Sequence, residues 1–182
     1  MRFELRITGF GGQGVVTAGR LLALTVMKTN QNINVIYVPS YGFATRGGDA
    51  LSDVILDEQA INYPKILGLD ILVALSQSAF NASADLVKDN GLIITDADVV
   101  NDTSKLKSGI KIFKLKVSEV VRSIGSSIFT SIVMLGVLSV QMPEVINENY
   151  LISVLEANFP KKYLDQNLKA ITAGKSLGAK LK

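Results

Sequence analysis

The sequence predicts an α/β fold with three layers, an open and mostly parallel sheet carrying helices on both faces in a Rossmann-like arrangement. Three observations predict it. Short strand-like runs alternate with helical segments, residues 70–75 form a continuous apolar run typical of a central parallel strand, and a glycine-rich turn separates the first strand from the first helix. With 48% hydrophobic and 19% charged residues, we expect residues 1–182 to form one globular domain.

The strands are predicted from alternation and from short apolar runs bounded by turn residues. In residues 3–7 apolar and polar side chains alternate, as they do in a half-buried strand. The expected strands are residues 3–7, 34–38, 50–57, 70–75, 92–95 and 110–115. Residues 39–49 are rich in turn formers and are expected to form a functional loop.

The helices are predicted from longer apolar segments and from their end signals. Asn90-Gly91 is expected to terminate the second helix, because both residues tolerate the left-handed conformation of a helix C-terminus. The expected helices are residues 15–27, 78–89, 118–123, 128–140, 147–157 and 160–173. Residues 128–140 are too short to cross a bilayer, which leaves a buried helix or an interface helix.

The turn after the first strand is the first candidate site. Gly9, Gly11 and Gly14 have the Gly-x-Gly-x-x-Gly spacing of dinucleotide-binding folds, and glycines let backbone N–H groups approach an anion closely. The residues expected to contact a ligand phosphate are Gly11, Gly12, Gln13 and Gly14. The alternative is a tight β-to-α turn without a ligand.

An ordinary NAD or FAD site is not expected. Such a site uses an acidic residue about 20 residues after the turn to bind the ribose hydroxyls. Between Glu4 and Asp49 the chain has no carboxylate side chain.

Residues 45–48 form the second candidate site. Arg46 offers a guanidinium fork, Gly47 and Gly48 offer accessible backbone N–H groups, and Thr45 precedes them. In an open α/β sheet this loop and the glycine turn are expected at the same edge. Alternatively, Arg46 forms an ion pair with Asp49 or Asp53.

Two further polar clusters have simpler interpretations. Asp96 and Asp98 follow a strand and are expected to cap or form turns, although they could form a metal-binding or acid–base pair. Ser76 and Ser78 follow the central strand, where they could line the ligand crevice or cap a helix.

The composition limits the possible chemistry. The chain has no cysteine and no histidine, which excludes thiolate and imidazole ligands and the commonest general base. We expect no catalytic and no metal-binding residue, and therefore a subunit or binding module. The start of the chain lies in a strand and carries no targeting signal, so a cytoplasmic location is expected without membrane contact.

The end of the chain is basic. Residues 161–182 contain six lysines and one acidic residue. They form either a solvated face or a docking surface for an acidic partner. Nucleic-acid binding is not expected, because the segment contains one aromatic residue and no known reading motif.

Three motifs together resemble the gamma subunits of 2-oxoacid:ferredoxin oxidoreductases, over nearly the whole chain. The motifs are residues 9–19 with the glycine turn, Ser40-Tyr41-Gly42 with Arg46-Gly47-Gly48, and Ile61-Asn62-Tyr63-Pro64-Lys65. The resemblance implies an α/β chain that assembles with alpha and beta subunits, often with a delta subunit, and that reaches ferredoxin through the complex. It also implies that thiamine diphosphate, magnesium and iron–sulfur clusters lie on the partner chains.

The form of these motifs is more similar to the 2-oxoglutarate and branched-chain types than to the pyruvate type. The resemblance implies a structural subunit that helps to bind coenzyme A through residues 45–48, and no activity in the isolated chain. The triplet Phe43-Ala44-Thr45 and Ser131, where the family commonly has asparagine, depart from its pattern. The alternatives are the beta subunit of indolepyruvate:ferredoxin oxidoreductase and an independent nucleotide-binding reductase.

Overall fold

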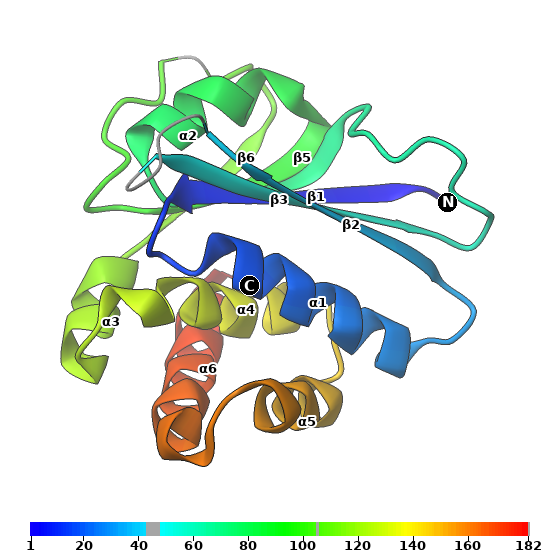
Figure 1. Ribbon diagram of the computed structural model, residues 1–182. Helices are drawn as coiled ribbons and strands as arrows, with labels where there is room; N and C mark the ends of the chain where they lie inside the picture. Colours follow the sequence, from blue (N-terminus) through cyan, green and yellow to red (C-terminus); the bar gives the residue numbers. More distant parts are fainter. Residues whose placement is uncertain (43–47, 105, 182) are drawn as a thin grey trace.

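In the computed structural model, which describes residues 1–42, 48–104 and 106–181, a six-stranded sheet forms the middle of the molecule (Figure 1). The strand order across the sheet is β2-β3-β1-β4-β5-β6. The strands are β1 Phe3–Phe10, β2 Asn34–Tyr41, β3 Asp49–Asp57, β4 Leu69–Ala74, β5 Val87–Asp96 and β6 Lys111–Leu115.

The sheet is mostly parallel, as the sequence predicts. Strands β1, β4, β5 and β6 pair in parallel, whereas β3 runs antiparallel to both of its neighbours, β1 and β2. In a dinucleotide-binding fold the second strand of the chain lies beside the first. Here β3 lies between β1 and β2, so the first two strands are not neighbours.

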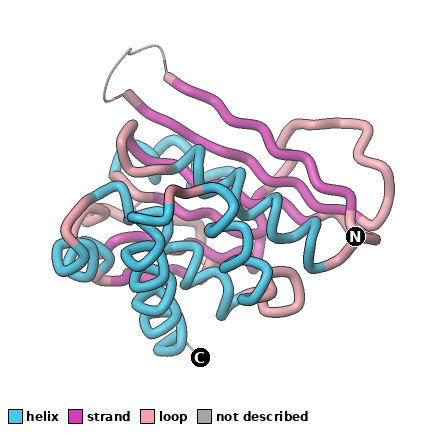
Figure 2. The backbone as a smooth tube through the Cα atoms, turned by 60° about the horizontal axis from the view of Figure 1, so that its bottom comes forward, coloured by secondary structure: helices cyan, strands magenta, loops and turns pink. Residues whose placement is uncertain are grey.

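Helices cover both faces of the sheet, but unequally (Figures 1 and 2). Helix α2 and the short 3₁₀ turn η1 lie on one face, while the other five α-helices lie on the opposite face. The α-helices are α1 Val15–Thr29, α2 Gln77–Ser83, α3 Val117–Ile124, α4 Thr130–Gln141, α5 Glu148–Asn158 and α6 Leu164–Gly178. The 3₁₀ turns are η1 Ala84–Leu86, η2 Ser127–Phe129, η3 Lys161–Tyr163 and η4 Ala179–Leu181.

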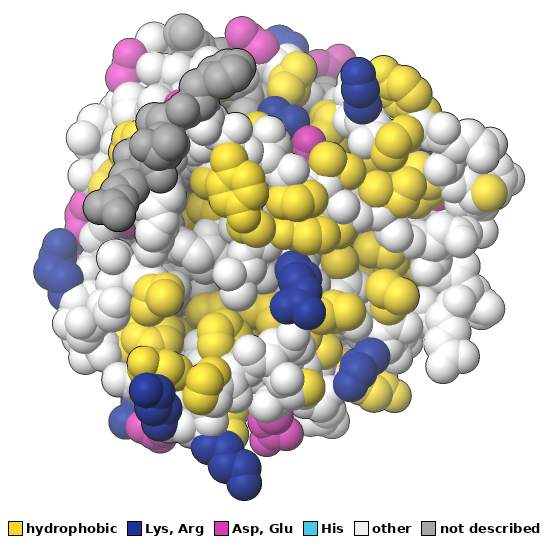
Figure 3. Space-filling model, in the orientation of Figure 1, with side chains coloured by type: hydrophobic (Ala, Val, Ile, Leu, Met, Phe, Trp, Pro, Cys, Tyr) yellow, Lys and Arg dark blue, Asp and Glu magenta, His cyan; other side chains and the backbone are white. Residues whose placement is uncertain are grey.

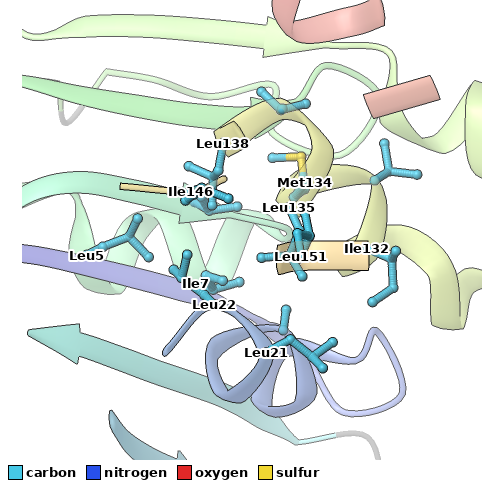
Figure 4. Close-up of a cluster of buried hydrophobic side chains, with 14 of the residues drawn as sticks. Leu5, Ile7, Leu21, Leu22, Ile132, Met134, Leu135, Leu138, Ile146 and Leu151 are labelled. Carbon is cyan, nitrogen blue, oxygen red and sulfur yellow. The ribbon is translucent and has the colours of Figure 1, made fainter. Parts of the chain in front are cut away.

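The main core lies between the sheet and the five helices (Figure 4). Leu5 and Ile7 of β1 face Leu21 and Leu22 of α1, and α4 supplies much of the remaining apolar surface. A smaller core beneath α2 contains Leu72 and Phe80. Alternate residues of the central strands therefore enter two different cores, which explains their continuous apolar character.

Two expected boundaries near the candidate site are wrong. The first strand continues to Phe10 rather than ending at Ile7. The second continues to Tyr41, so residues 39–41, expected in a loop, pair with β3. Pro39 is compatible with this position because β2 is an edge strand, where one side of the backbone needs no hydrogen-bonded neighbour.

The expected helix over residues 78–89 is also wrong in its second half. Helix α2 ends at Ser83, η1 follows, and β5 begins at Val87. Asn90 does adopt a left-handed conformation, with φ of 66°, but it lies within β5, where the register of the β4–β5 pair shifts. The Asn-Gly signal marks a bulge here rather than a helix end.

Helix α4 resolves the alternative between a buried and an interface helix. Every residue from Thr130 to Ser139 is buried within this chain, so the helix is a core element. Where α4 meets α6, a Cβ atom built on Gly174 would lie 1.9 Å from the Val133 carbonyl oxygen. Glycine at this position therefore allows the two helix backbones to touch. In the described part of the chain no helix is both long and apolar enough to span a bilayer.

Candidate functional site

The glycine turn joins the carboxyl end of β1 to the amino end of α1. Gly12 has a φ of 93° and Gly14, the N-cap of α1, has a φ of 75°. Both angles lie in the left-handed region that favours glycine. Gly11 and Gly12 are exposed, and a Cβ atom on Gly12 would meet nothing within 4 Å. The turn thus presents its backbone to open space.

Gln13 has a role that the sequence did not reveal. Its Oε1 accepts a hydrogen bond from the Phe10 N–H at 2.7 Å, and its Nε2 donates to the Leu75 carbonyl at 3.1 Å. The side chain ties the turn to the end of β4, so Gln13 organises the turn through both ends of its amide. The three-residue spacing between Phe10 and Gln13 could have indicated this bond in the sequence, because polar side chains commonly bond the backbone of their own turn.

Two glycines of the motif are required by close packing. A Cβ atom on Gly9 would lie 2.3 Å from Gln13 Oε1, and one on Gly14 would lie 2.5 Å from Ser131 Oγ. Cβ atoms essentially never approach non-bonded heavy atoms closer than 3.0 Å. Gly9 therefore makes room for the Gln13 side chain, and Gly14 lets the start of α1 approach α4 closely.

The second predicted site reaches the first through Gly48. The Gly11 N–H donates to the Gly48 carbonyl at 2.8 Å, and the Gly42 N–H donates to the Asp49 carbonyl at 2.7 Å. These bonds place both described ends of the loop beside the glycine turn, in agreement with the expected shared edge. Thr45, Arg46 and Gly47 lie outside the described residues.

Side chains of the β2–β3 hairpin hold the amino end of α1 in place. The Tyr37 hydroxyl donates to the Val16 carbonyl at 2.7 Å, and the Ser52 hydroxyl donates to the Val15 carbonyl at 3.1 Å. A Cβ atom on Gly19 would lie 2.1 Å from Ser52 Oγ, so glycine permits this approach. Burial is the main cause that raises the pKa of Tyr37 above its usual range.

Exposed apolar side chains surround the turn. Phe10, Tyr41 and Ile128 are 43%, 71% and 54% exposed, and they line a shallow groove of about 230 Å³ together with Gly11 and Gly12. Figure 3 shows hydrophobic side chains gathered on this face of the molecule, where β2 lies in Figure 1. The groove combines the backbone of two glycines with apolar side-chain walls.

The remaining polar clusters follow their simpler interpretations. Asp96 accepts hydrogen bonds from the Asp98 N–H and from the Ser118 N–H and hydroxyl, and Ser76 caps α2 by accepting from the Ala79 N–H at 3.1 Å. Among the described residues no group of three acidic side chains could hold a metal ion.

Of the two acceptors suggested for Arg46, Asp53 is already paired within the chain. Both carboxylate oxygens of Asp53 bind the Arg6 guanidinium, at 2.7 and 2.8 Å. This pair joins β1 to β3 and is largely buried. Asp49 accepts a hydrogen bond from the Ser78 hydroxyl at 3.1 Å.

The glycine turn lies at the start of α1, a position that suits an anion. Exposed N–H groups at a helix N-terminus favour an anion such as a phosphate. No histidine or cysteine exists in the chain, and neither Asp53 nor Asp96 is free in this structure. The geometry is that of a ligand- or partner-binding edge.

Comparison with known proteins identifies the family. Residues 4–177 match the model of the pyruvate ferredoxin/flavodoxin oxidoreductase family. The chain belongs to this family. A 2-oxoglutarate synthase subunit from Methanocaldococcus jannaschii is 30% identical, over 100% of this chain and 96% of the relative. The resemblance to gamma subunits of 2-oxoacid:ferredoxin oxidoreductases is thus confirmed, and the chain is a subunit of such an enzyme.

Solved structures agree with this assignment. The gamma subunit of a keto/oxoacid ferredoxin oxidoreductase from Geobacter sulfurreducens is 25% identical, with a TM-score of 0.79 over 99% of this chain and 98% of that chain. A 2-oxoglutarate:ferredoxin oxidoreductase from Magnetococcus marinus, solved with 2-oxoglutarate, coenzyme A and succinyl-CoA, matches with a TM-score of 0.89 and 22% identity. The match covers 100% of this chain and 32% of the longer Magnetococcus chain. It confirms the predicted fold.

The alternative family member is more distant. An indolepyruvate oxidoreductase subunit from Archaeoglobus fulgidus is 26% identical, over 96% of this chain and 94% of the relative. The similarity therefore favours the gamma-type subunit.

Proposed function

We propose that this chain is the gamma subunit of a 2-oxoglutarate:ferredoxin oxidoreductase and contributes to coenzyme A binding at the glycine turn. The 2-oxoglutarate assignment is supported by the relative that shares 30% identity along the entire chain. In this proposal residues 1–182 form one gamma-type domain of a cytoplasmic enzyme.

One observation carries the coenzyme A role: the hydrogen bond from Gly11 to Gly48. It brings the ends of residues 43–47 to a turn in which Gly12 and Gly14 have left-handed backbone angles. Coenzyme A carries several phosphates, and the start of α1 favours them electrostatically. The proposed contacts are made by Gly12, Gly14 and residues 45–48, while Gly11 and Gln13, expected among the contacts, hold the turn in shape through their bonds to Gly48, Phe10 and Leu75.

The other components of the enzyme belong to its partners in this proposal. Without cysteine or histidine in the chain, iron–sulfur clusters have no ligands here. We assign the clusters, thiamine diphosphate and magnesium to alpha, beta and, where present, delta subunits. Electrons reach ferredoxin through those subunits.

Gly12→Ala tests the turn, with Gly125→Ala as its matched control. Gly125 has a φ of 109°. A Cβ atom added at Gly125 would meet nothing within 4 Å, as at Gly12. Both substitutions strain one left-handed residue, by about 1 kcal/mol, but Gly125 lies at the end of α3. In the reconstituted complex we expect the coenzyme A KM to rise at least about tenfold for Gly12→Ala alone.

Arg46→Ala tests the loop independently. Loss of a charged hydrogen bond to a phosphate costs about 1.5–3 kcal/mol, which corresponds to a rise of about 10- to 150-fold in the coenzyme A KM. The 2-oxoacid KM should change little. An unchanged coenzyme A KM in both Gly12→Ala and Arg46→Ala, in stably assembled complexes, refutes the coenzyme A role.

A further inference from the structure

The outer edge of strand β2 is open. Within the described part of the chain no strand lies beyond β2, and Figure 2 shows the β2–β3 hairpin at the margin of the molecule. In an antiparallel pair, alternate residues bond the neighbouring strand, and the residues between them direct their N–H and C=O groups away from it.

The register identifies the outward backbone groups of β2. The Gly42 N–H donates to the Asp49 carbonyl at 2.7 Å, so the residues at even positions of β2 bond β3. Pro39, which has no N–H to donate, belongs to the other set. Val35 and Tyr37 are in the same set as Pro39. Their N–H and C=O groups therefore face the outside of the sheet.

The two edges of the sheet differ in charge. Strand β6, at the opposite edge, carries the exposed Lys111 and Lys114. Lysines on an edge strand discourage another strand from pairing with it. Residues 29–42, which include β2, contain no charged side chain. Pro39 limits pairing at one end only, so residues 34–38 remain as an edge that nothing in their sequence protects.

The side chains of this stretch are apolar on both faces of the sheet. Val35 and Tyr37 pack against the main core. Ile36 and Val38 alternate with them and lie on the opposite face, where α2 packs on β1 and β4, toward the middle of the sheet. All four side chains are only partly buried. A strand added beside β2 would cover apolar surface on both faces, which favours its association.

One cation lies beside this edge. A Cβ atom on Gly19 would lie 3.1 Å from Tyr37 Cε2, and the next residue, Arg20, is exposed. Burial raises the pKa of Tyr37, and the Arg20 charge is close enough to lower it in part. Among the described residues Arg20 forms no ion pair. Asp57 and Glu58, near the start of β2, already pair with the amino terminus.

The Arg20 charge distinguishes the possible occupants. If a second copy paired antiparallel through Val35 and Tyr37, the twofold axis would pass close to these residues and bring both Arg20 side chains to the same face of the joined sheet. Like charges placed there oppose pairing. An extended segment of a different chain can instead place an acidic side chain opposite Arg20. The family assignment makes this chain a subunit of a larger enzyme, which supplies such a chain.

We propose that residues 34–38 of β2 are the docking site for an extended segment of a partner subunit, which adds to the sheet as a further strand and pairs an acidic side chain with Arg20. Main-chain bonds to Val35 and Tyr37 hold the segment, and alternate apolar side chains cover the two faces. This inference rests on membership of the enzyme and does not depend on the coenzyme A role.

Residue-resolved hydrogen exchange tests the main-chain contacts. It is measured on the full 182-residue chain alone and in the purified complex with its partner subunits. The Ile36 and Val38 amides, which bond β3, should be protected in both states. We expect the Val35 and Tyr37 amides to exchange rapidly in the isolated chain and at least about tenfold more slowly in the complex. The outward amides of β6 should not change.

Arg20→Glu tests the charge, with Lys111→Glu as its matched control. Both side chains are exposed and lie at opposite edges of the sheet, and both substitutions change the net charge equally. We expect the Kd for the partner subunits to rise at least about tenfold for Arg20→Glu and to stay nearly constant for Lys111→Glu. Arg20→Lys should retain most of the affinity. The melting temperatures of the isolated variants check that the fold is intact.

Three results overturn the proposal. Unchanged exchange at Val35 and Tyr37 in the assembled complex excludes an added strand. Equal loss of affinity in Arg20→Glu and Lys111→Glu excludes an acidic partner at Arg20. Slow exchange at Val35 and Tyr37 in the isolated chain, together with a dimer in light scattering, identifies a second copy of this chain as the occupant instead.

Discussion

At the residue scale, the glycine motif combines positions with different physical reasons for glycine. Gly9 has no unusual backbone angle but leaves room for Gln13, Gly12 has only the left-handed angle, and Gly14 has both requirements. Glycine is therefore required for a different reason at each of these three positions. Of the three, Gly12 alone has no neighbouring atom that an added Cβ atom would meet.

Gly14→Ala should destabilise the chain more than Gly125→Ala. Both replace a left-handed glycine, which costs about 1 kcal/mol, but only at Gly14 does the new Cβ atom meet Ser131 Oγ, at 2.5 Å. We expect a further loss of about 1–3 kcal/mol at Gly14 from overpacking. Urea unfolding of both variants measures the difference, and equal losses would show that the clash is relieved without cost.

At the element scale, the site depends on how α1 is held. Its first turn is bonded by Tyr37 and Ser52 from the β2–β3 hairpin, and the same hairpin leads into residues 43–47. The antiparallel β3 thus links the start of α1 to the loop that carries Arg46.

Tyr37→Phe tests this link. Loss of the hydrogen bond to Val16 should lower the free energy of unfolding by about 0.5–1.5 kcal/mol. Because burial raises the folded-state pKa of Tyr37, its contribution is present below about pH 10, the unfolded value, and is lost as the pH rises through the folded value.

The alkaline part of the stability profile provides the check on Tyr37. The wild-type chain should lose more stability than Tyr37→Phe as the pH increases above about 10. Parallel profiles for the two proteins in this range would contradict the assignment.

The contact between α4 and α6 predicts a graded response to alanine. A Cβ atom on Gly174 would lie 1.9 Å from a backbone oxygen, whereas one on Gly178 would be 3.1 Å from its nearest atom. Gly174→Ala should therefore cost at least about 2 kcal/mol through forced helix separation. Gly178→Ala should cost less, because alanine favours the helix. Thermal unfolding ranks the two, and the opposite order would be evidence against backbone contact at Gly174.

At the scale of the whole molecule, the chain is one subunit of an oxidoreductase. The glycine turn, Gly48 and the apolar groove lie at one edge of the sheet, while the buried acidic groups serve the fold. Under the proposed function, the catalytic groups belong to other subunits.

The pure 182-residue chain should show no 2-oxoacid oxidation. It has no cysteine or histidine and, among its described residues, no acidic cluster that could bind a metal ion. Turnover is measured with 2-oxoglutarate, coenzyme A and a viologen dye, with the reconstituted complex as the positive control. Activity that persists after partner subunits are shown to be absent would refute the subunit role.

The sequence by itself determined the α/β class, the strand–turn–helix around Gly9–Gly14 and the central parallel strand, whereas it left residues 128–140 as either a buried or an interface helix. These features depend on local periodicity and on glycine and capping signals. The three family motifs are likewise local patterns. For this reason they pointed to the gamma subunits before any contact was known.

Only the tertiary structure decided the rest. Residues 39–41 became strand because β3 pairs with them, and Asn90 became part of a bulge because β4 lies beside it. The bonds of Gln13 to Leu75 and of Gly11 to Gly48 join segments far apart in the chain. Such contacts depend on how the elements pack, which local patterns do not encode.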